Sequence, residues 1–287
     1  MKQIFTFIFA VVIVTACDLE KEIDIDGVEF REAINISGNI SRQYGASVYV
    51  ECTRPPQSSY LGHKKIDDAK VYLTSGGEKI AEIPIDSFYN DGMLYHIDID
   101  TFNYKSYGVL VESERLGTAY STEQTLPDEI AADSVIVTKS GKNSLIATFY
   151  FTNDKNQAGY YCTAYTADRI IDELGRIFAI SFYGDDATNF QNARKSDYCQ
   201  ISCVFYPTST YYDDMEYYAD FITLSPDFVK YLKSEEEYYA SQEDEFFDYP
   251  YPLYSNIKGG YGFFGAYTVS QTSGVVLGGY TSNSFVD

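Results

Sequence analysis

Short runs in which apolar and polar residues alternate dominate the chain from residue 31 to residue 125. Ile34, Ile36 and Ile40 alternate with asparagine and serine, a period of two that is typical of a β-strand with one buried face. The alternation recurs in the runs 48–52, 69–74, 93–99, 107–111 and 119–125, and turn signals such as Ser75-Gly76-Gly77-Glu78 separate them. About seven short strands at this spacing predict an immunoglobulin-like β-sandwich over residues 31–125.

The alternation stops at Leu126-Pro127-Asp128 and begins again at Val135 and Val137. Proline and acidic residues interrupt a strand pattern, so residues 126–133 are predicted to be a linker. The region 134–287 is again rich in strands, which we expect at 145–151, 161–165, 176–183, 199–206 and 216–224. The sequence therefore predicts a second β-rich domain.

One segment of this second domain has helical spacing instead. Ser225 suits an N-cap, Pro226 the first helical position, and Asp227 the positive end of a helix. Phe228 and Leu232 recur at the interval of one helical face. The predicted fold class is thus mostly β: an N-terminal immunoglobulin-like β-sandwich, then a β-rich domain with one prominent helix at about residues 225–241.

The first 16 residues have the layout of a secretory signal. Lys2 supplies a positive charge, an apolar run extends from Ile4 to Val14, and small residues follow. The ending Val14-Thr15-Ala16-Cys17 resembles the lipobox of bacterial lipoproteins, in which the cysteine is acylated and becomes the first residue. The expected outcome is removal of residues 1–16 and a lipid anchor on Cys17; the alternative is an ordinary signal peptide cut nearby.

An acidic tether over residues 17–30 follows the predicted anchor. Asp18, Glu20, Glu22 and Asp24 resemble the export signal that directs Bacteroidota lipoproteins to the outer face of the outer membrane. A solvated, flexible spacer accounts for the same residues, and both interpretations are compatible. We expect an outer-membrane protein that faces the extracellular side and contacts the membrane through its lipid only.

The charge of the chain narrows its possible partners. With 21 Lys+Arg against 42 Asp+Glu, the net charge is −21, which argues against nucleic acid as a partner, because its binding requires basic patches. Acidic loops such as Asp185-Asp186, Asp213-Asp214 and Glu243-Asp244-Glu245 are candidates for calcium, but none has the spacing of a calcium-binding loop. Solvation of the loops is the favoured explanation, and no metal or cofactor is predicted.

Histidine, cysteine and glycine give little sign of catalysis. His63 lies in a predicted loop and His96 on the outward face of a strand, and no Gly-x-Ser-x-Gly or His-Glu-x-x-His pattern accompanies them. The glycine-rich stretch 259–265 lacks a phosphate-loop pattern and is expected to allow bulges or close backbone contacts.

After Cys17 the cysteines are Cys52, Cys162, Cys199 and Cys203. A disulfide from Cys162 to Cys199 or Cys203 is favoured, because Cys199 and Cys203 on one strand would lie ~13 Å apart, too far to bridge each other.

Tyrosine is the most conspicuous residue of the chain, with 29 Tyr beside 19 Phe and no Trp. Exposed tyrosines suit contacts with a protein, a peptide or a glycan. The alternative is that these tyrosines pack the two domains together. The candidate contact surface comprises Tyr211, Tyr212, Tyr217, Tyr218, Tyr249, Tyr251 and Tyr254.

Several short pieces occur in a characteristic order along the chain after Cys17. They are Gly38-Asn39-Ile40, Asp67-Asp68-Ala69-Lys70-Val71, Ala132-Asp133-Ser134-Val135, Leu224-Ser225 before the helix, and Asn256-Ile257-Lys258-Gly259-Gly260. Together they resemble domain of unknown function family 4249, lipoproteins of the Bacteroidota. The resemblance implies an accessory or ligand-binding lipoprotein beside a TonB-dependent transporter, with no catalytic residues. A structural or fimbria-like adhesive protein is the first alternative, and a glycan-acting enzyme is the second.

Overall fold

The computed structural model describes residues 30–55, 63–86, 93–99, 103–140, 144–154, 156–166, 191–192, 198–205, 217–243, 251–275 and 280–282. Residues 1–31 and 32–287 form separate compact units, and the fold below belongs to the second. The predicted signal peptide and most of the tether, with Cys17, Asp18, Glu20, Glu22 and Asp24, lie outside the described residues, as does the strand expected at 176–183.

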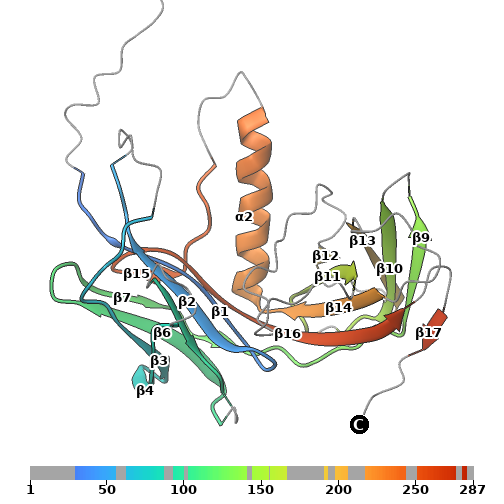
Figure 1. The fold of residues 1–287 in the computed structure, drawn as a ribbon, viewed down its shortest axis with the longest axis horizontal. Helices are drawn as coiled ribbons and strands as arrows, with labels where there is room; N and C mark the ends of the chain where they lie inside the picture. Colours follow the sequence, from blue (N-terminus) through green and yellow to red (C-terminus); the bar gives the residue numbers. More distant parts are fainter. Residues whose placement is uncertain are drawn as a thin grey trace, which may run out of the picture. The chain divides into compact units, whose positions relative to one another are not determined.

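Strands make up most of the described structure, which confirms the predicted fold class (Figure 1). The largest sheet has seven strands. Their order is β12 (Gln191–Asn192), β11 (Gly159–Thr166), β14 (Tyr217–Leu224), β16 (Tyr261–Val275), β1 (Ile34–Ser41), β2 (Gly45–Cys52) and β5 (Leu94–Ile97).

Two smaller sheets complete the β-structure. A six-stranded sheet has the order β15 (Ile257–Lys258), β7 (Gly117–Ser121), β6 (Ser106–Ser113), β3 (Lys70–Ser75) and β4 (Glu78–Ile83), with β8 (Gln124–Thr125) paired to β6. A four-stranded sheet has the order β13 (Tyr198–Phe205), β10 (Leu145–Thr152), β9 (Ser134–Lys139) and β17 (Tyr280–Ser282).

Strand β16 joins the two β-rich regions. Its first half pairs in parallel with β1, from Asn35 opposite Tyr261 to Ser41 opposite Tyr267. Its second half pairs antiparallel with β14, from Leu224 opposite Tyr267 to Tyr217 opposite Val275. The seven-stranded sheet therefore contains strands from both sides of the predicted linker 126–133, and backbone hydrogen bonds connect the two regions. The division into two domains stays a prediction.

Three hydrophobic cores follow from the alternation along these strands. Ile34, Ile36 and Ile40 of β1 are fully buried in the first core, with Phe264 and Ala266 of β16 and residues of the six-stranded sheet. The second core contains Phe149, Phe151 and Phe221, between the four-stranded sheet and the β11–β14 part of the large sheet. The third lies under the helix and contains Phe263, Tyr267 and Val269, on the opposite face of β16 from Phe264.

The glycine-rich stretch allows the chain to pass from one sheet to another. Ile257 and Lys258 pair with β7 of the six-stranded sheet, and Tyr261 begins the pairing with β1 of the seven-stranded sheet. A Cβ on Gly262, which has φ of 105°, would lie 1.9 Å from the backbone oxygen of Ile36. The expected close backbone contact is confirmed here, because only glycine has neither the clash nor the strain of a positive φ.

The four cysteines of the described region are free. The expected bridge from Cys162 to β13 is therefore wrong for this structure, although Cys162 and Cys203 both lie in the second core. Burial, together with a hydrogen bond to Cys203, raises the pKa of the Cys162 thiol well above its usual value. The Cys162 thiol is thus neutral and lies beside Cys203 of the facing sheet.

Candidate functional site

The helix α2 (Pro226–Glu243) begins where the sequence predicted, because local capping and burial agree. The backbone N–H of Phe228 donates to Ser225 Oγ at 3.4 Å, which gives the first turn an N-cap. Phe228, Val229 and Leu232 are buried in the third core. The first half of α2 is therefore fixed to β16 by its apolar face.

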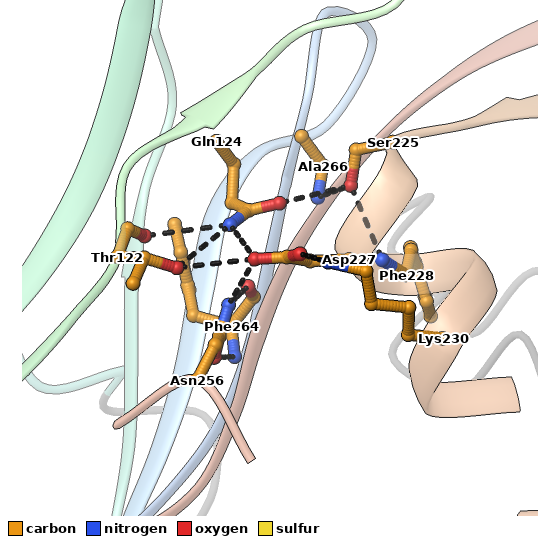
Figure 2. Close-up of polar contacts among 9 residues, drawn as sticks. All are labelled: Thr122, Gln124, Ser225, Asp227, Phe228, Lys230, Asn256, Phe264 and Ala266. Atoms are coloured by element: carbon orange, nitrogen blue, oxygen red, sulfur yellow. Dashed lines mark hydrogen bonds and ion pairs between the residues drawn. The ribbon is translucent and has the colours of Figure 1, made fainter. Parts of the chain in front are cut away.

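Asp227 lies at the centre of a polar network at the start of α2 (Figure 2). Its Oδ2 accepts from Gln124 Nε2 at 2.9 Å and Thr122 Oγ1 at 3.1 Å, and its Oδ1 accepts from Lys230 Nζ at 2.8 Å. Partial burial opposes ionisation, but the hydrogen bonds from Lys230, Gln124, Tyr254 and Thr122 outweigh it and hold the pKa of Asp227 well below its usual range. The helix is thus joined to the β7–β8 connection by an ionised, satisfied carboxylate.

Asn256 and Ser225 extend this network to β16. Asn256 Nδ2 donates to the carbonyl oxygen of Phe264 at 2.8 Å, and the N–H of Phe264 donates to Asn256 Oδ1 at 3.0 Å. Ser225 Oγ donates to Gln124 Oε1 at 3.1 Å and accepts from the N–H of Ala266 at 3.2 Å. These side chains bond to the backbone and to one another, so we assign them a positioning role rather than a ligand-binding one.

The segment Tyr251–Tyr254 runs along the second half of α2. The N–H of Tyr251 donates to Ser241 Oγ at 3.2 Å, and the N–H of Tyr254 donates to Ser234 Oγ at 2.7 Å. Because Ser234 and Ser241 are about two helical turns apart, these two bonds hold the segment antiparallel to the helix. We call Ser234–Glu243 together with Tyr251–Tyr254 the α2 arm.

The α2 arm exposes large apolar side chains. Tyr239, Tyr251 and Leu253 have exposed fractions of 53%, 47% and 45%. Glu236 and Glu237 of the same helix are exposed, and a hydrogen bond to Glu237 raises the pKa of the Tyr251 hydroxyl. Aromatic groups beside carboxylates can pack against a partner's apolar groups and pair with its cations.

The predicted tyrosine surface is divided by the structure. Tyr251 and Tyr254 belong to the α2 arm, whereas Tyr218 lies on β14, where its ring stacks on Tyr165 at 5.6 Å. The assignment of Tyr217 to a surface is wrong: this residue is fully buried in the second core, because it shares the inward face of β14 with Ala219 and Phe221. Tyr211, Tyr212 and Tyr249 lie outside the described residues.

His96 is buried, contrary to the expectation of a surface residue. Its Nδ1 lies 2.9 Å from Ser47 Oγ, and its Nε2 lies 3.0 Å from Asp98 Oδ1. The residue types are those of a hydrolase triad, but Ser47 lies in the middle of β2, which is hydrogen-bonded to β1 on one side and β5 on the other. The hydrogen bonds of β2 with these two strands occupy the backbone N–H groups that an oxyanion hole would need. We therefore interpret Ser47, His96 and Asp98 as a hydrogen-bonded link between β2 and β5.

No group of three histidine, cysteine or acidic residues that could hold a metal ion occurs among the described residues. The acidic loops at 185–186, 213–214 and 244–245 lie outside them. No helix in the described ranges is both long enough and apolar enough to cross a membrane.

The fold and site define a mostly β protein of sandwich type with an exposed aromatic helix. The chain belongs to the family described as Domain of unknown function (DUF4249), whose model matches residues 20–273. Among solved structures, it is similar to the chicken CNTN1 FN1-FN3 domains, with 10% sequence identity and a TM-score of 0.22. That match covers 84% of this chain and 66% of the chicken chain. It therefore spans less than two thirds of the length of the chicken chain. No curated protein matches.

Proposed function

We propose that this chain is a lipid-anchored protein of the outer-membrane surface that acts beside a TonB-dependent transporter. In this proposal the α2 arm contacts the transporter or the peptide or glycan that the transporter takes up. The anchor is Cys17, and the acidic residues Asp18, Glu20, Glu22 and Asp24 direct the protein to the outer face. The protein binds and does not catalyse.

The observation that carries the proposal is the exposure of Tyr239 on the second half of α2 and of Tyr251 and Leu253 on the segment beside it. When a partner covers exposed aromatic side chains, their apolar surface is removed from water, which favours binding. Protein interfaces are also enriched in tyrosine. The network around Asp227 and the hydrogen bonds that Ser234 and Ser241 accept hold the arm in one arrangement before binding. Such preorganisation lowers the entropic cost of association.

Affinity purification from the native host after mild detergent extraction tests this function. We expect a transporter to copurify in stoichiometric amount with the wild-type protein, and to be lost when Tyr239, Tyr251 and Leu253 are all replaced by alanine. Tyr120→Ala is the matched control, because Tyr120 is an aromatic residue of the six-stranded sheet with 45% exposure. Recovery of the protein only with copies of itself would instead support a structural or adhesive role.

A further inference from the structure

Asp220 is a fully buried acidic residue. It lies on β14, an interior strand of the seven-stranded sheet. Its neighbours Ala219 and Phe221 face the second core, so the Asp220 side chain lies on the other face, which carries Ile222 and Leu224 of the third core. In the sheet it is opposite Thr163 of β11 and Gln271 of β16. A fully buried carboxyl group therefore lies on this face of the sheet, and it takes no part in the hydrogen bonds around Asp227.

Only one of the two carboxyl oxygens of Asp220 accepts a hydrogen bond from the described residues. Gln271 Nε2 donates to Asp220 Oδ1 at 3.1 Å and lies 2.7 Å from the Tyr165 hydroxyl oxygen. Asp220 Oδ2 has no hydrogen-bond partner in the described part of the chain. Gln271 is exposed and Tyr165 is half-buried, so the two side chains that interact with the Asp220 carboxyl group both reach solvent.

Tyrosines from three segments surround this carboxyl group. Burial and the charge of Asp220 raise the pKa of Tyr44, in the β1–β2 turn, to about 12. The same two causes raise the pKa of Tyr165 on β11, and burial is the main cause of the raised pKa of Tyr267 on β16. Tyr165 in turn stacks on Tyr218 with an interplanar angle of 12°. In the described part of the chain, the surroundings of Asp220 are thus rich in neutral aromatic side chains.

An ionised carboxylate in such a place is costly unless a donor reaches its free oxygen. Burial raises the pKa of Asp220 to about 6, so the group is ionised at neutral pH. A compact ammonium group supplies N–H donors to a single oxygen, and aromatic rings stabilise a cation at their faces. A guanidinium group fits less well, because its planar paired donors engage both oxygens of a carboxylate at once, whereas an ammonium group needs only one.

We propose that Asp220, with Tyr44, Tyr165 and Gln271, forms a binding site for a primary ammonium group, as carried by a free amine or a lysine side chain. The entering ammonium group displaces the Gln271 amide and donates to Asp220 Oδ2. The charge at the site is then neutralised within the aromatic surroundings. This proposal depends neither on the lipid anchor nor on the α2 arm.

Calorimetric titration of the full-length protein in mild detergent with n-butylammonium tests the site. At about pH 7.5 we expect saturable binding, weakened at least tenfold by Asp220→Asn, and roughly tenfold weaker at pH 5 because a proton competes for the carboxylate. Asp86→Asn is the matched control: it also removes a buried acid, outside this site and outside the α2 arm, and it should leave binding unchanged. The neutral analogue n-butanol should not bind.

A second variant keeps the test decisive if Asp220→Asn fails to fold. Gln271→Ala removes the amide over the carboxylate and should tighten binding several-fold. Titration with Nα-acetyl-lysine amide separates the sources: tighter binding than n-butylammonium indicates a peptide lysine, and equal binding indicates a free amine. Equal affinity in wild type and Asp220→Asn, or no binding of either amine, would overturn the proposal.

Discussion

The side-chain amide of Asn256 and the backbone of Phe264 exchange two hydrogen bonds, of 2.8 and 3.0 Å. Asn256 thereby acts as a one-residue strand partner of β16, at the point where the chain enters the six-stranded sheet at β15. Both residues are buried, so water cannot replace either bond. This pair connects the Asp227 network to the longest strand of the fold.

Asn256→Ala is expected to destabilise the protein by about 2–4 kcal/mol, because it leaves the buried N–H and C=O of Phe264 unsatisfied. Chemical denaturation followed by far-ultraviolet circular dichroism measures the change. Asn35→Ala is the control, since the Asn35 amide bonds to the carboxylate of Glu51 on a partly solvated face. A similar loss of stability in the two variants would show that the Asn256–Phe264 pair has no special role.

Gly262→Ala should cost about 4 kcal/mol or more, or prevent folding, because the new Cβ meets the Ile36 oxygen at 1.9 Å. Gly76→Ala places the same methyl group at a positive φ of 61° with no atom within 4 Å. Backbone strain alone costs about 1–2 kcal/mol. The difference in unfolding free energy between the two variants isolates the clash at the β1–β16 crossing, and equal effects would contradict it.

Asp220 gives the free energy of unfolding a definite dependence on pH. Its pKa is about 6 in the folded protein against 3.8 for the unperturbed group, so the unfolded state releases its proton first as the pH rises. The stability that the protonated carboxyl contributes is fully present below about pH 3.8 and is lost as the pH rises through about 6.

Asp220→Asn should remove this dependence. Relative to the variant, the wild type should lose stability on the order of 3 kcal/mol between about pH 3.5 and pH 7. Urea denaturation of both proteins across this range measures the difference. A constant difference over the range would show that Asp220 does not titrate between these values.

Cys17→Ala should release the protein from membranes or leave the signal uncleaved, because no thiol remains to be acylated. Fractionation and intact mass measure both outcomes. Cys52→Ala, which changes a buried cysteine of β2, should leave the protein in the membrane fraction. Unchanged fractionation of Cys17→Ala would contradict the proposed anchor.

Local features of the sequence predicted the strands and the helix well. Ser225, Pro226 and Asp227 lie next to one another, so the start of α2 could be read directly from the sequence, and the alternation of Ile34 and Ile36 indicated which face of β1 is buried. The pairing of β1 with β16 could not be predicted in this way, because Asn35 and Tyr261 are partners separated by most of the chain. No periodic pattern encodes which strand lies beside which.

The candidate sites were predicted less well, for a physical reason. Tyr217 stands beside Tyr218 in the sequence, but a strand turns neighbouring side chains to opposite faces, so one is buried and the other half-buried. Asp220 does stand out in the sequence, because it is the only acid in the otherwise apolar and tyrosine-rich strand Tyr217–Leu224. The Asp227 network joins segments about a hundred residues apart, which sequence spacing does not reveal.

Site-specific photo-crosslinking in the native host tests the central claim most directly. A photoreactive phenylalanine analogue replaces Tyr251 in the α2 arm, and the same group replaces Tyr120 as the exposed aromatic control. We predict that the Tyr251 position forms a crosslink to a TonB-dependent transporter and that the Tyr120 position does not. Equal crosslinking from both positions, or crosslinks from Tyr251 only to other copies of this chain, would contradict the account.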